Sequence, residues 1–304
     1  MRIAIMGSGG VGGYFGGRLA AAGEDVHFIA RGRHLEALRQ DGLRLVSPKG
    51  DLHLPTVQAT DDPASIGPVD VVLFTVKLYD VDASAQAIRP LIGPDTVVVT
   101  MQNGVEAVDM VAAHVGREHV AGGACYISAV IDRPGVIRHT AMDTMVFGEL
   151  DGRASSRLQA FEAAGQRAGY DAKLTPDVQA VLWTKFVRLS GWSGMTAATR
   201  SPIGVLRDNP EIFAVLRQAF EEAVAVGRAR GVDLPATILE ETLQLVQTFP
   251  PQTKSSLLED LERGRRLELP WLSGAVVRLG AEAGVPAPTH RFITAVLTPF
   301  VDGK

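Results

Sequence analysis

The opening residues, MRIAIMGSGGVGGYFGG, contain a cluster of glycines whose only chemistry is that of the bare main chain. Seven of the eleven residues from Gly7 to Gly17 are glycine. In ordered structure each glycine costs roughly 0.5–1 kcal/mol relative to alanine, so the cluster predicts a group lying directly against the backbone. Gly7, Gly9 and Gly12 also follow the spacing G-x-G-x-x-G, in which backbone amides face a diphosphate. The first chemistry that the sequence indicates is therefore anion binding by main-chain N–H groups.

The elements on either side of the glycines match that chemistry. Residues 2–6 are mostly apolar on both faces, as in a strand buried within a parallel sheet. Val11, Phe15 and Leu19 then repeat at the spacing of one helix face. A strand, a glycine turn and a helix are the context in which this motif binds a dinucleotide, with the diphosphate at the helix N-terminus. The predicted cofactor-binding loop consists of Gly7, Ser8, Gly9, Gly10, Val11 and Gly12.

The end of the second predicted strand, DVHFIA at 25–30, bears on the choice of nicotinamide cofactor. NAD-binding units place Asp or Glu near this point to bind the ribose 2′-hydroxyl. Residues 26–35 contain no acid here, and Arg31 and Arg33 follow the strand. A guanidinium can pair with a 2′-phosphate, whereas cations at the start of the next helix would otherwise oppose its dipole. We therefore predict NADP(H), with Arg31 at the 2′-phosphate, against the alternative of two solvated arginines.

Two more polar residues follow buried strands of the predicted sheet. Lys77 comes after the apolar run at 70–76, and Asn103 comes after the run at 96–101. Ligands bind beyond the carboxyl ends of the parallel strands in such sheets. Both side chains are therefore expected at the ligand crevice. A solvated loop lysine and a turn asparagine before Gly104 are the ordinary alternatives.

From Pro176 onward, strand patterns give way to long helical ones. The segment AVLWTKFVRLSGW at 180–192 sets Lys185 among apolar residues. Such a lysine either extends its amine to water or, if partly desolvated, serves as a general acid. Glu268 in RRLELPW has the plain alternative of a surface carboxylate, and the serines at 255 and 256 that of a helix N-cap. A helical half after a Rossmann half predicts a substrate cleft between the two.

Length, composition, net charge and cysteine content limit the classes of protein to which this chain can belong. The 304 residues suffice for two domains, and 46% hydrophobic with 21% charged residues is typical of globular proteins. The net charge of −4 disfavours nucleic acid as a partner, and no apolar run suits a membrane span or a secretory leader. The single cysteine, Cys125, excludes an internal disulfide, and no histidines have metal-ligand spacing. We expect a soluble cytoplasmic protein without a metal.

Taken in order, these motifs resemble those of the ketopantoate reductase (2-dehydropantoate 2-reductase) family. The likeness runs over nearly the whole chain, through GSGGVGGYFGG, FTVK, QNGV, WTKF and SSLLEDLERGRRLEL. It implies NADPH-dependent reduction of ketopantoate to pantoate in pantothenate biosynthesis. Beyond the glycine loop, the residues that it implies at the site are Arg31 and Lys77 for the cofactor, Asn103 for cofactor and substrate, Lys185 as proton donor, and Ser256 and Glu268 for binding substrate or orienting the lysine.

The chain departs from the family pattern after WTKF. Leu189 and Ser193 stand where the resemblance implies two substrate-binding asparagines, and Gly194 replaces a proline. Ser193 remains a candidate substrate ligand, but an apolar Leu189 would leave a matching polar group unpaired, at a cost of about 1–3 kcal/mol. Ile203 stands near the position of a further asparagine. Arg200 is an additional cation, with either a carboxylate-binding or a surface role.

The sequence thus predicts an α/β protein, with a Rossmann NADP-binding domain at 1–175 and an all-α substrate and dimerisation domain at 176–304. The predicted activity is NADPH-dependent reduction of a 2-oxo acid, first of all ketopantoate. A homodimer formed through the apolar C-terminal helices is an open possibility. The alternatives are the same hydride chemistry on another 2-oxo acid, carbonyl or imine, and a non-catalytic NADP-binding sensor.

Overall fold

The computed structural model describes all 304 residues, which fall into two compact units. The first unit comprises Met1–Gln102 and Glu106–Val178, and the second comprises Asn103–Val105 and Gln179–Lys304. The main division lies at 178/179, beside the boundary predicted between residues 175 and 176. The second unit is discontinuous in sequence, because three residues that follow a strand of the first unit group with the helices.

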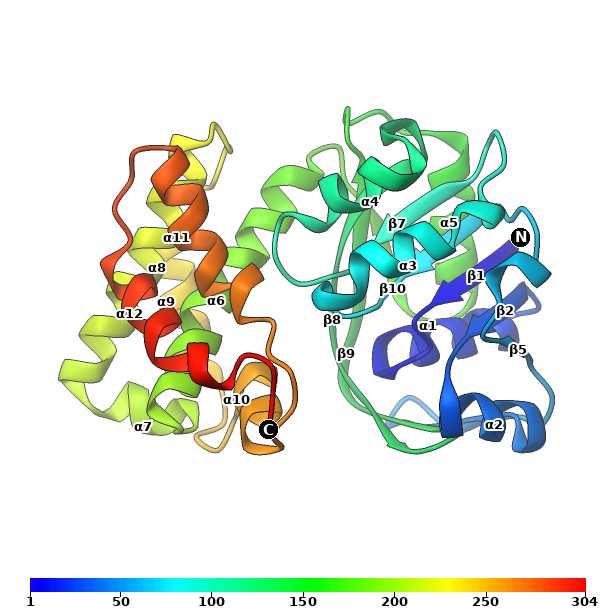
Figure 1. Cartoon of the computed structure of the whole chain (residues 1–304), viewed down its shortest axis with the longest axis horizontal. Coiled ribbons are helices and arrows are strands. Elements are labelled where there is room, and N and C mark those ends of the chain that lie inside the picture. The colour runs from blue at the N-terminus through cyan, green and yellow to red at the C-terminus, as the bar shows by residue number, and fades with distance from the viewer. The chain divides into compact units, whose positions relative to one another are not determined.

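The first unit is a ten-stranded mixed sheet with helices packed against it (Figure 1). Its strands are β1 (Arg2–Met6), β2 (Asp25–Ile29), β3 (Leu43–Val46), β4 (Leu52–Leu54), β5 (Gln58–Thr60), β6 (Val71–Phe74), β7 (Val97–Thr100), β8 (Val120–Arg133), β9 (Val136–Glu149) and β10 (Asp171–Leu174). Its helices are α1 (Gly10–Ala21), α2 (Gly32–Asp41), α3 (Val81–Ala87), α4 (Ala107–Val115) and α5 (Ser156–Arg167). This architecture confirms the predicted α/β class.

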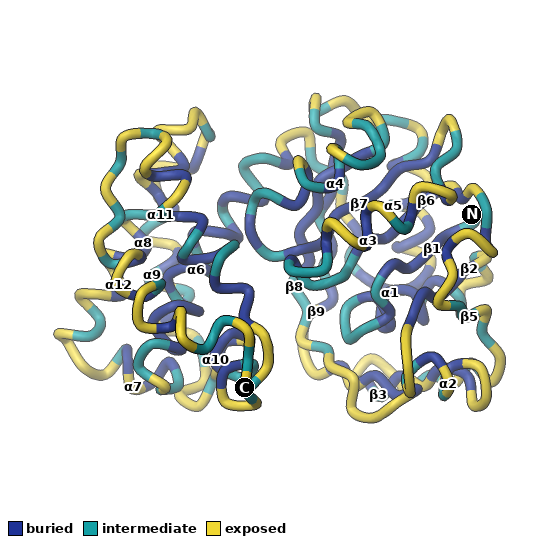
Figure 2. Tube along the Cα trace, viewed as in Figure 1, coloured by how far each residue is buried: buried dark blue, intermediate teal, exposed yellow.

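The strand order determines where a ligand can bind. It runs β4-β3-β9-β8-β7-β6-β1-β2-β5, and the strands from β8 to β5 are mutually parallel. β6 and β7 are buried throughout and β1 nearly so, because their apolar residues pack on both faces of the sheet (Figure 2). The carboxyl ends of parallel strands share one edge. At that edge β1, β2, β6 and β7 lead into the segments that contain Gly7, Arg31, Lys77 and Asn103.

The antiparallel part of the sheet is a long hairpin of β8 and β9. The sequence indicates two separate segments, at 135–140 and 144–150, where the structure has the single strand β9. Register shifts near Ser128 and a φ of 55° at Met142 mark the irregular stretch that divides the pattern. The segment LRLVSPKGDLHLP at 43–55 alternates around a Pro-Lys-Gly-Asp turn and predicts a β-hairpin, which the structure confirms as β3 and β4. β3 also pairs with β9 in parallel.

The second unit is helical, which confirms the predicted all-α C-terminal half. Its helices are α6 (Val178–Thr199), α7 (Ile203–Asp208), α8 (Pro210–Ala229), α9 (Ile238–Thr248), α10 (Ser256–Glu262), α11 (Ser273–Glu282) and α12 (Pro288–Leu297). The boundaries of α8 follow from its sequence: the Asn209 side chain accepts N–H bonds from Glu211 and Ile212, Pro210 occupies the first turn, and Gly231 lies just past the end.

The helix α6 contributes to both apolar clusters of the second unit. Near its start, Trp183 and Phe186 pack into a cluster with residues of α8 and α11. Near its end, Met195 and Ala197 pack into a second cluster with residues of α7, α10 and α12. Because both ends of α6 are anchored in this way, the side chains along it hold defined positions.

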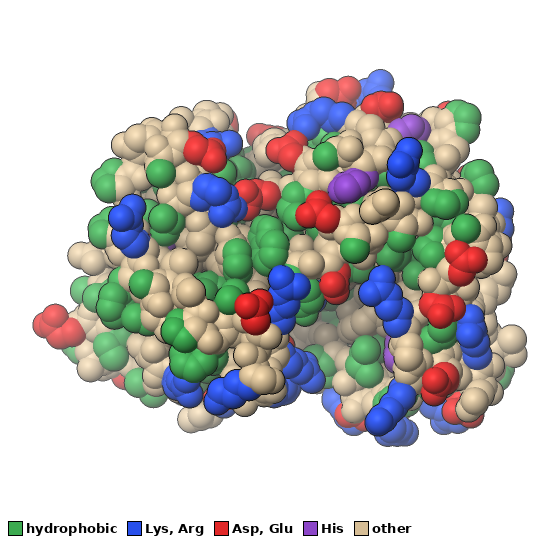
Figure 3. All heavy atoms as spheres, in the orientation of Figure 1, with side chains coloured by type: hydrophobic (Ala, Val, Ile, Leu, Met, Phe, Trp, Pro, Cys, Tyr) green, Lys and Arg blue, Asp and Glu red, His purple; other side chains and the backbone are tan.

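The surface combines mixed charge with a few exposed apolar residues. On the face drawn in Figure 3, acidic and basic side chains of the first unit are intermixed. The first unit also contains local ion pairs, such as that of Arg39 with Asp61. In the second unit, Phe292 and Val296 of α12 are 65% and 38% exposed. These residues are compatible with the homodimer, which stays a prediction. None of the helices has the length and apolar character needed to cross a bilayer.

Candidate active site

Two glycines of the loop between β1 and α1 are required by the packing of the first unit. Gly7 has a φ of +97°, and a Cβ there would come within 2.9 Å of the Val76 nitrogen. A Cβ on Gly12 would come within 2.5 Å of the Thr75 hydroxyl, which donates to the Gly7 carbonyl at 2.8 Å. Both glycines therefore let the loop and α1 lie directly on the strand ends, as the sequence motif indicates.

Gly9 is a glycine of the G-x-G-x-x-G motif, whereas Gly10 occupies one of its variable positions, and the two have different environments. A Cβ on Gly10 would collide with the Ala129 carbonyl oxygen of β8, so this glycine is required by the hairpin. A Cβ on Gly9 would meet no protein atom within 4 Å. Gly9 is the N-cap of α1 and offers no side chain to the first amides of the helix. The space beside Gly9 therefore lies at N–H groups that favour an anion.

Ser8 and Val11 support the loop from within. Ser8 is 4% exposed, and its backbone N–H and its hydroxyl donate to the Ile29 carbonyl at 3.1 and 3.0 Å. These bonds tie the loop to the end of β2. Val11 is partly buried against the main apolar cluster of the first unit. Any contact of these two residues with a cofactor would come from their main chain, and that role stays a prediction.

A second site suited to an anion lies at the start of α2. Arg31 is the N-cap of this helix in an extended conformation, and Arg31 and Arg33 are both exposed. Neither guanidinium forms an ion pair or hydrogen bond with the rest of the chain. Cations at a helix N-terminus oppose the helix dipole unless an anion joins them. The turn therefore has two unengaged cations in a position where a phosphate would be stabilising.

Lys77 lies where the chain leaves β6, half-buried, as the N-cap of a short turn at 78–80. The chain before it is held by Gln102, whose side-chain amide donates to the carbonyls of Phe74 at 2.9 Å and Val76 at 3.1 Å. Gln102 is 5% exposed. Gln102 was not predicted as part of the site, and only its position directly after a buried strand could have indicated it.

Asn103 belongs to the helical unit together with the next two residues. The reason is Val105, which packs against the apolar cluster that contains Trp183 and Phe186. Asn103 is half-buried, and its side-chain amide makes no hydrogen bond within the chain. An amide with two donors and an acceptor is thus held beside the helices with its capacity unused.

Lys185, Leu189, Ser193 and Thr196 lie along one side of α6, because helix positions four and eleven apart share a face. Lys185 is 9% exposed, and Ser193 and Thr196 are buried. Leu189 is half-buried and packs against the cluster that contains Phe186. This side of α6 therefore presents a primary amine, an apolar side chain and two hydroxyl groups in a row.

Glu268 is buried in the second unit rather than solvated. It precedes the short turn Leu269–Trp271, and it is 5% exposed. Leu267 and Leu269 on either side of it are buried in the same apolar cluster. The plain alternative of a surface carboxylate is therefore wrong. Lys185 and Glu268 are two buried groups of opposite charge in one helical unit, and buried charges are costly unless they are compensated.

The two adjacent serines before α10 have different roles. Ser255 is the N-cap, accepting the Leu258 N–H at 3.1 Å, and its buried hydroxyl lies 2.7 Å from that of Thr196 on α6. Ser256 is exposed. The hydroxyl joined to the Lys185 side of α6 is therefore that of Ser255, and Ser256 as a substrate ligand stays a prediction.

The departures from the family pattern have local packing reasons. A Cβ on Gly194 would come within 2.7 Å of the Ser273 hydroxyl and 2.9 Å of Ile293, so glycine lets α6 approach α11 and α12. Ile203 is fully buried in an apolar cluster. Arg200 follows α6 with a φ of 50°, is exposed, and stacks over the Phe300 ring at 5.1 Å, which favours its surface role.

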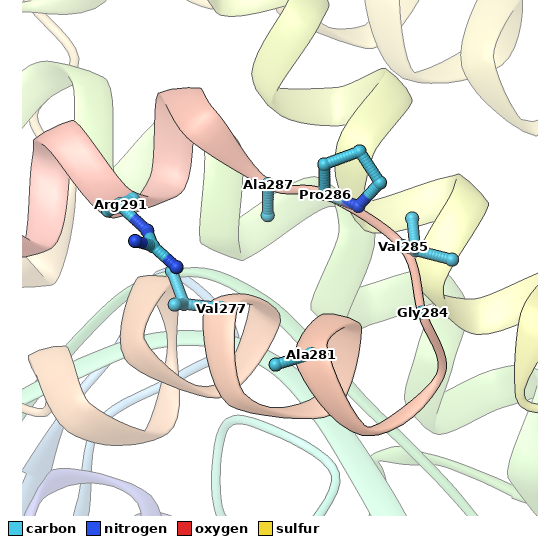
Figure 4. Close-up of a pocket in the computed structure, with 7 residues that line it drawn as sticks. All are labelled: Val277, Ala281, Gly284, Val285, Pro286, Ala287 and Arg291. Carbon is cyan, nitrogen blue, oxygen red and sulfur yellow. The ribbon is translucent and has the colours of Figure 1, made fainter.

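Two surface cavities of the second unit do not involve these residues. One, of about 240 Å³, lies between α11 and the start of α12, where Arg291 extends toward Val277 (Figure 4). The other, of about 250 Å³, lies between α8 and α9. None of the predicted site residues lines either cavity.

Comparison with known proteins identifies the family. This chain is similar to a 2-dehydropantoate 2-reductase of Mesorhizobium japonicum, with 32% identity over 98% of this chain and 97% of the relative. Its structure is similar to the crystal structure of a PanE/ApbA family ketopantoate reductase from Ralstonia eutropha, with a TM-score of 0.92 and 34% identity over 99% and 98% of the two chains. It shares its fold, at a TM-score of 0.91 and 19% identity over 99% and 98% of the chains, with D-mandelate dehydrogenase, solved with NADH and anilino(oxo)acetate.

Family models cover both units. The model described as "Ketopantoate reductase PanE/ApbA" matches residues 3–152, and the model of the C-terminal part of that family matches residues 177–300. Together the two matched ranges include all of the predicted site residues. The chain therefore belongs to the PanE/ApbA ketopantoate reductase family, a family of dinucleotide-dependent oxidoreductases that act on CH–OH groups.

Proposed function

We propose that this chain is an NADPH-dependent reductase of a 2-oxo acid, with ketopantoate as the first candidate substrate. The observation that carries the proposal is Lys185, a primary amine only 9% exposed on a largely apolar helix. Keeping an amine from water is costly unless its interactions compensate for the loss of hydration. Donation of a proton to a carbonyl oxygen is a reaction that such an amine can perform.

The residues of the first unit fit NADPH at two separate points. The N-terminus of α1, with open space at Gly9, would hold the diphosphate. Arg31, with Arg33 beside it, would hold the 2′-phosphate. Lys77 and Asn103 would hold the nicotinamide end. When bound, the cofactor supplies the hydride, and the residues of the chain position both reactants.

Gly9→Ala should separate cofactor binding from folding. The added methyl group meets no protein atom, so the thermal unfolding midpoint should stay close to that of the wild type. The methyl group would, however, occupy the space proposed for the diphosphate. We expect the dissociation constant for NADPH, measured by calorimetric titration, to rise by about tenfold or more, as for the loss of charge-assisted hydrogen bonds.

Gly12→Ala is the matched control, because its methyl group would press on Thr75. This substitution should lower the thermal midpoint, since overpacking costs about 1–3 kcal/mol. Unchanged NADPH affinity in a well-folded Gly9→Ala variant would contradict diphosphate binding at this loop.

In the proposed reaction, the hydride adds to the ketone carbon and negative charge develops on the oxygen. Lys185, as an ammonium, would stabilise that charge and donate a proton to the oxygen. Glu268 would support the charged form of the amine against its burial. The Asn103 amide would hydrogen-bond to the nicotinamide ribose or the substrate. Ser193 and Ser256 are further candidates for binding the substrate.

Leu189 favours a second candidate within the same chemistry, a 2-oxo acid with an apolar side chain. Leu189 lies one turn from Lys185 and belongs to the same apolar cluster as Val105. A substrate bound at Lys185 would therefore contact the apolar side chain of Leu189. A substrate hydroxyl left unpaired there would cost about 1–3 kcal/mol, whereas an apolar group would gain about 25 cal/mol for each Å² buried.

A substrate series distinguishes these candidates. Ketopantoate and 3,3-dimethyl-2-oxobutanoate differ by one hydroxyl group. The ratio of their kcat/KM values with NADPH therefore measures how favourably the site binds that hydroxyl group. If Leu189 forms the pocket wall, Leu189→Asn should shift this ratio toward ketopantoate by about tenfold, the value of roughly one hydrogen bond. Leu189→Met is the control that keeps the wall apolar. An unchanged ratio would exclude Leu189 from the substrate pocket, and no turnover of any 2-oxo acid would contradict the proposed function.

A further inference from the structure

His34 connects three segments of the first unit that are distant in sequence. Its Nε2 lies 2.8 Å from the Ser8 carbonyl oxygen in the glycine loop, and its Nδ1 accepts the backbone N–H of Gly135 at 3.1 Å. Gly135 lies in the turn of the β8–β9 hairpin. Because Nδ1 is an acceptor, the proton of the neutral ring is on Nε2 and is donated to Ser8.

His34 lies in the first turn of α2 and follows Arg33 directly in the sequence. The N–H and the hydroxyl of Ser8 hold the glycine loop to β2, whereas its carbonyl is held by His34 of α2. One side chain of α2 thus contacts the glycine loop, three residues after Arg31 at the N-cap of the same helix.

We propose that His34 is a positioning residue that keeps these two anion sites in register for one dinucleotide. The inference rests on the proposed function. A diphosphate and a 2′-phosphate on the same molecule have a nearly fixed separation, so a chain that holds both sites at that separation before binding avoids the entropy cost of ordering them. His34 does not touch the cofactor in this proposal; it acts through Ser8 and Arg31.

The hairpin provides the fixed support on the other side of the ring. The Gly135 carbonyl accepts the N–H of Arg44 at 2.9 Å, and a Cβ on Gly135 would lie 3.2 Å from the Ala37 side chain. The hairpin also lies directly on the first turn of α1 at Ala129 and Gly10. The ring is therefore held between the loop, α2 and the hairpin.

Protonation would break one of the two hydrogen bonds, since a charged imidazole has no acceptor for the Gly135 N–H. Burial lowers the pKa of His34, and the hydrogen bond to Ser8 acts in the opposite direction to a smaller extent. Both bonds are therefore present at neutral pH. As the pH falls through this lowered pKa, the bond from the Gly135 N–H is lost, whereas Nε2–H can still donate to the Ser8 carbonyl. The charged side chains of α2 and its N-cap are Arg31, Arg33, Glu36, Arg39 and Asp41, and those next to the hairpin turn are Arg44, Asp132, Arg133 and Arg138. None of them forms an ion pair with the ring.

Three substitutions separate the two hydrogen bonds. His34→Gln places an amide near the Nε2 position and can keep the bond to Ser8, whereas His34→Asn places one near Nδ1 and can keep only the bond to Gly135. His34→Ala keeps neither. Dissociation constants for NADPH and NADH are measured by fluorescence titration of the full chain, and the thermal midpoint of each ligand-free variant is measured alongside.

We expect His34→Ala and His34→Asn to weaken NADPH binding by roughly three- to tenfold, and His34→Gln to stay within about twofold of wild type. Gln and Asn variants should have similar thermal midpoints, because each loses one bond. The ratio of NADPH affinities between the wild type and His34→Gln should change little with pH, because protonation of His34 removes only the Gly135 bond, which His34→Gln already lacks.

The outcomes distinguish this proposal from the proposed function. If the wild type binds NADPH but the Gln and Asn variants lose affinity equally, or none of the variants loses any, the positioning role of His34 is wrong and the reductase assignment stands. If the wild type binds neither NADPH nor NADH, the proposed function itself is wrong.

Discussion

Lys185→Ala is expected to lower the turnover number by about 10²- to 10⁴-fold, the usual contribution of a general acid. The affinity for NADPH should change little, because Lys185 lies in the second unit and the proposed diphosphate and 2′-phosphate sites lie in the first. Single-turnover oxidation of NADPH, followed by its absorbance, measures the chemical step directly. A titration of NADPH into the same variant measures binding.

Arg188→Ala is the matched control for this substitution. Arg188 is another cation on α6 and is less buried than Lys185. Its guanidinium forms an ion pair with Glu241 at 3.4 Å. Arg188→Ala should leave turnover within about threefold of wild type, because a partly exposed ion pair contributes little free energy. Intact turnover in Lys185→Ala would remove the lysine from the mechanism. A chain that binds NADPH but reduces no carbonyl compound would instead support the alternative of a non-catalytic sensor.

Arg31→Ala is expected to raise the dissociation constant for NADPH by about 10- to 100-fold, since a hydrogen bond to a charged group contributes about 1.5–3 kcal/mol. The dissociation constant for NADH should change by less than about threefold, because NADH has no 2′-phosphate for the guanidinium to bind. Calorimetric titration of both cofactors gives the ratio of the two effects, which is the quantity that tests the assignment. The loss for NADPH should shrink at high salt, because screening weakens the interaction of exposed charges.

Arg39→Ala serves as the control on the same helix. Arg39 lies in the last turn of α2 and pairs with Asp61 at 3.3 Å, far along the helix from its N-terminus. Its removal should affect both cofactors equally and weakly. Equal losses of NADPH and NADH in Arg31→Ala would defeat the assignment of the 2′-phosphate to this arginine.

Features that depend on local pattern were predictable from the sequence. The apolar run before Gly7 and the helical spacing after it are sufficient for a strand, a turn and a helix, and the structure contains them as β1, the loop and α1. The cap of α8 at Asn209 follows from side-chain chemistry within three residues. The all-α second half and the hairpin of β3 and β4 are confirmed for the same reason. In each case the groups that determine the structure are neighbours in the chain.

Features that depend on contacts between distant segments were decided only by the tertiary structure. A side chain at residue 10 would collide with β8, whereas a side chain at residue 9 would extend into open space. His34 and Gly135, which share a hydrogen bond, are 101 residues apart. The pairing of Thr196 with Ser255 rather than Ser256 depends on how α10 packs on α6. Glu268 is buried by the leucines around it, although its own sequence resembles a surface turn.

The physical reason for this division is the range of the forces involved. Propensity, capping and turn formation act over a few residues, so their results can be read from the sequence. Burial and side-chain hydrogen bonding depend on which segments meet in the fold. The sequence by itself therefore determined the elements, the family and the chemical types available to the site. Only the tertiary structure decided why Gly10 can bear no side chain, which histidine contacts the glycine loop and which charged groups are kept from water.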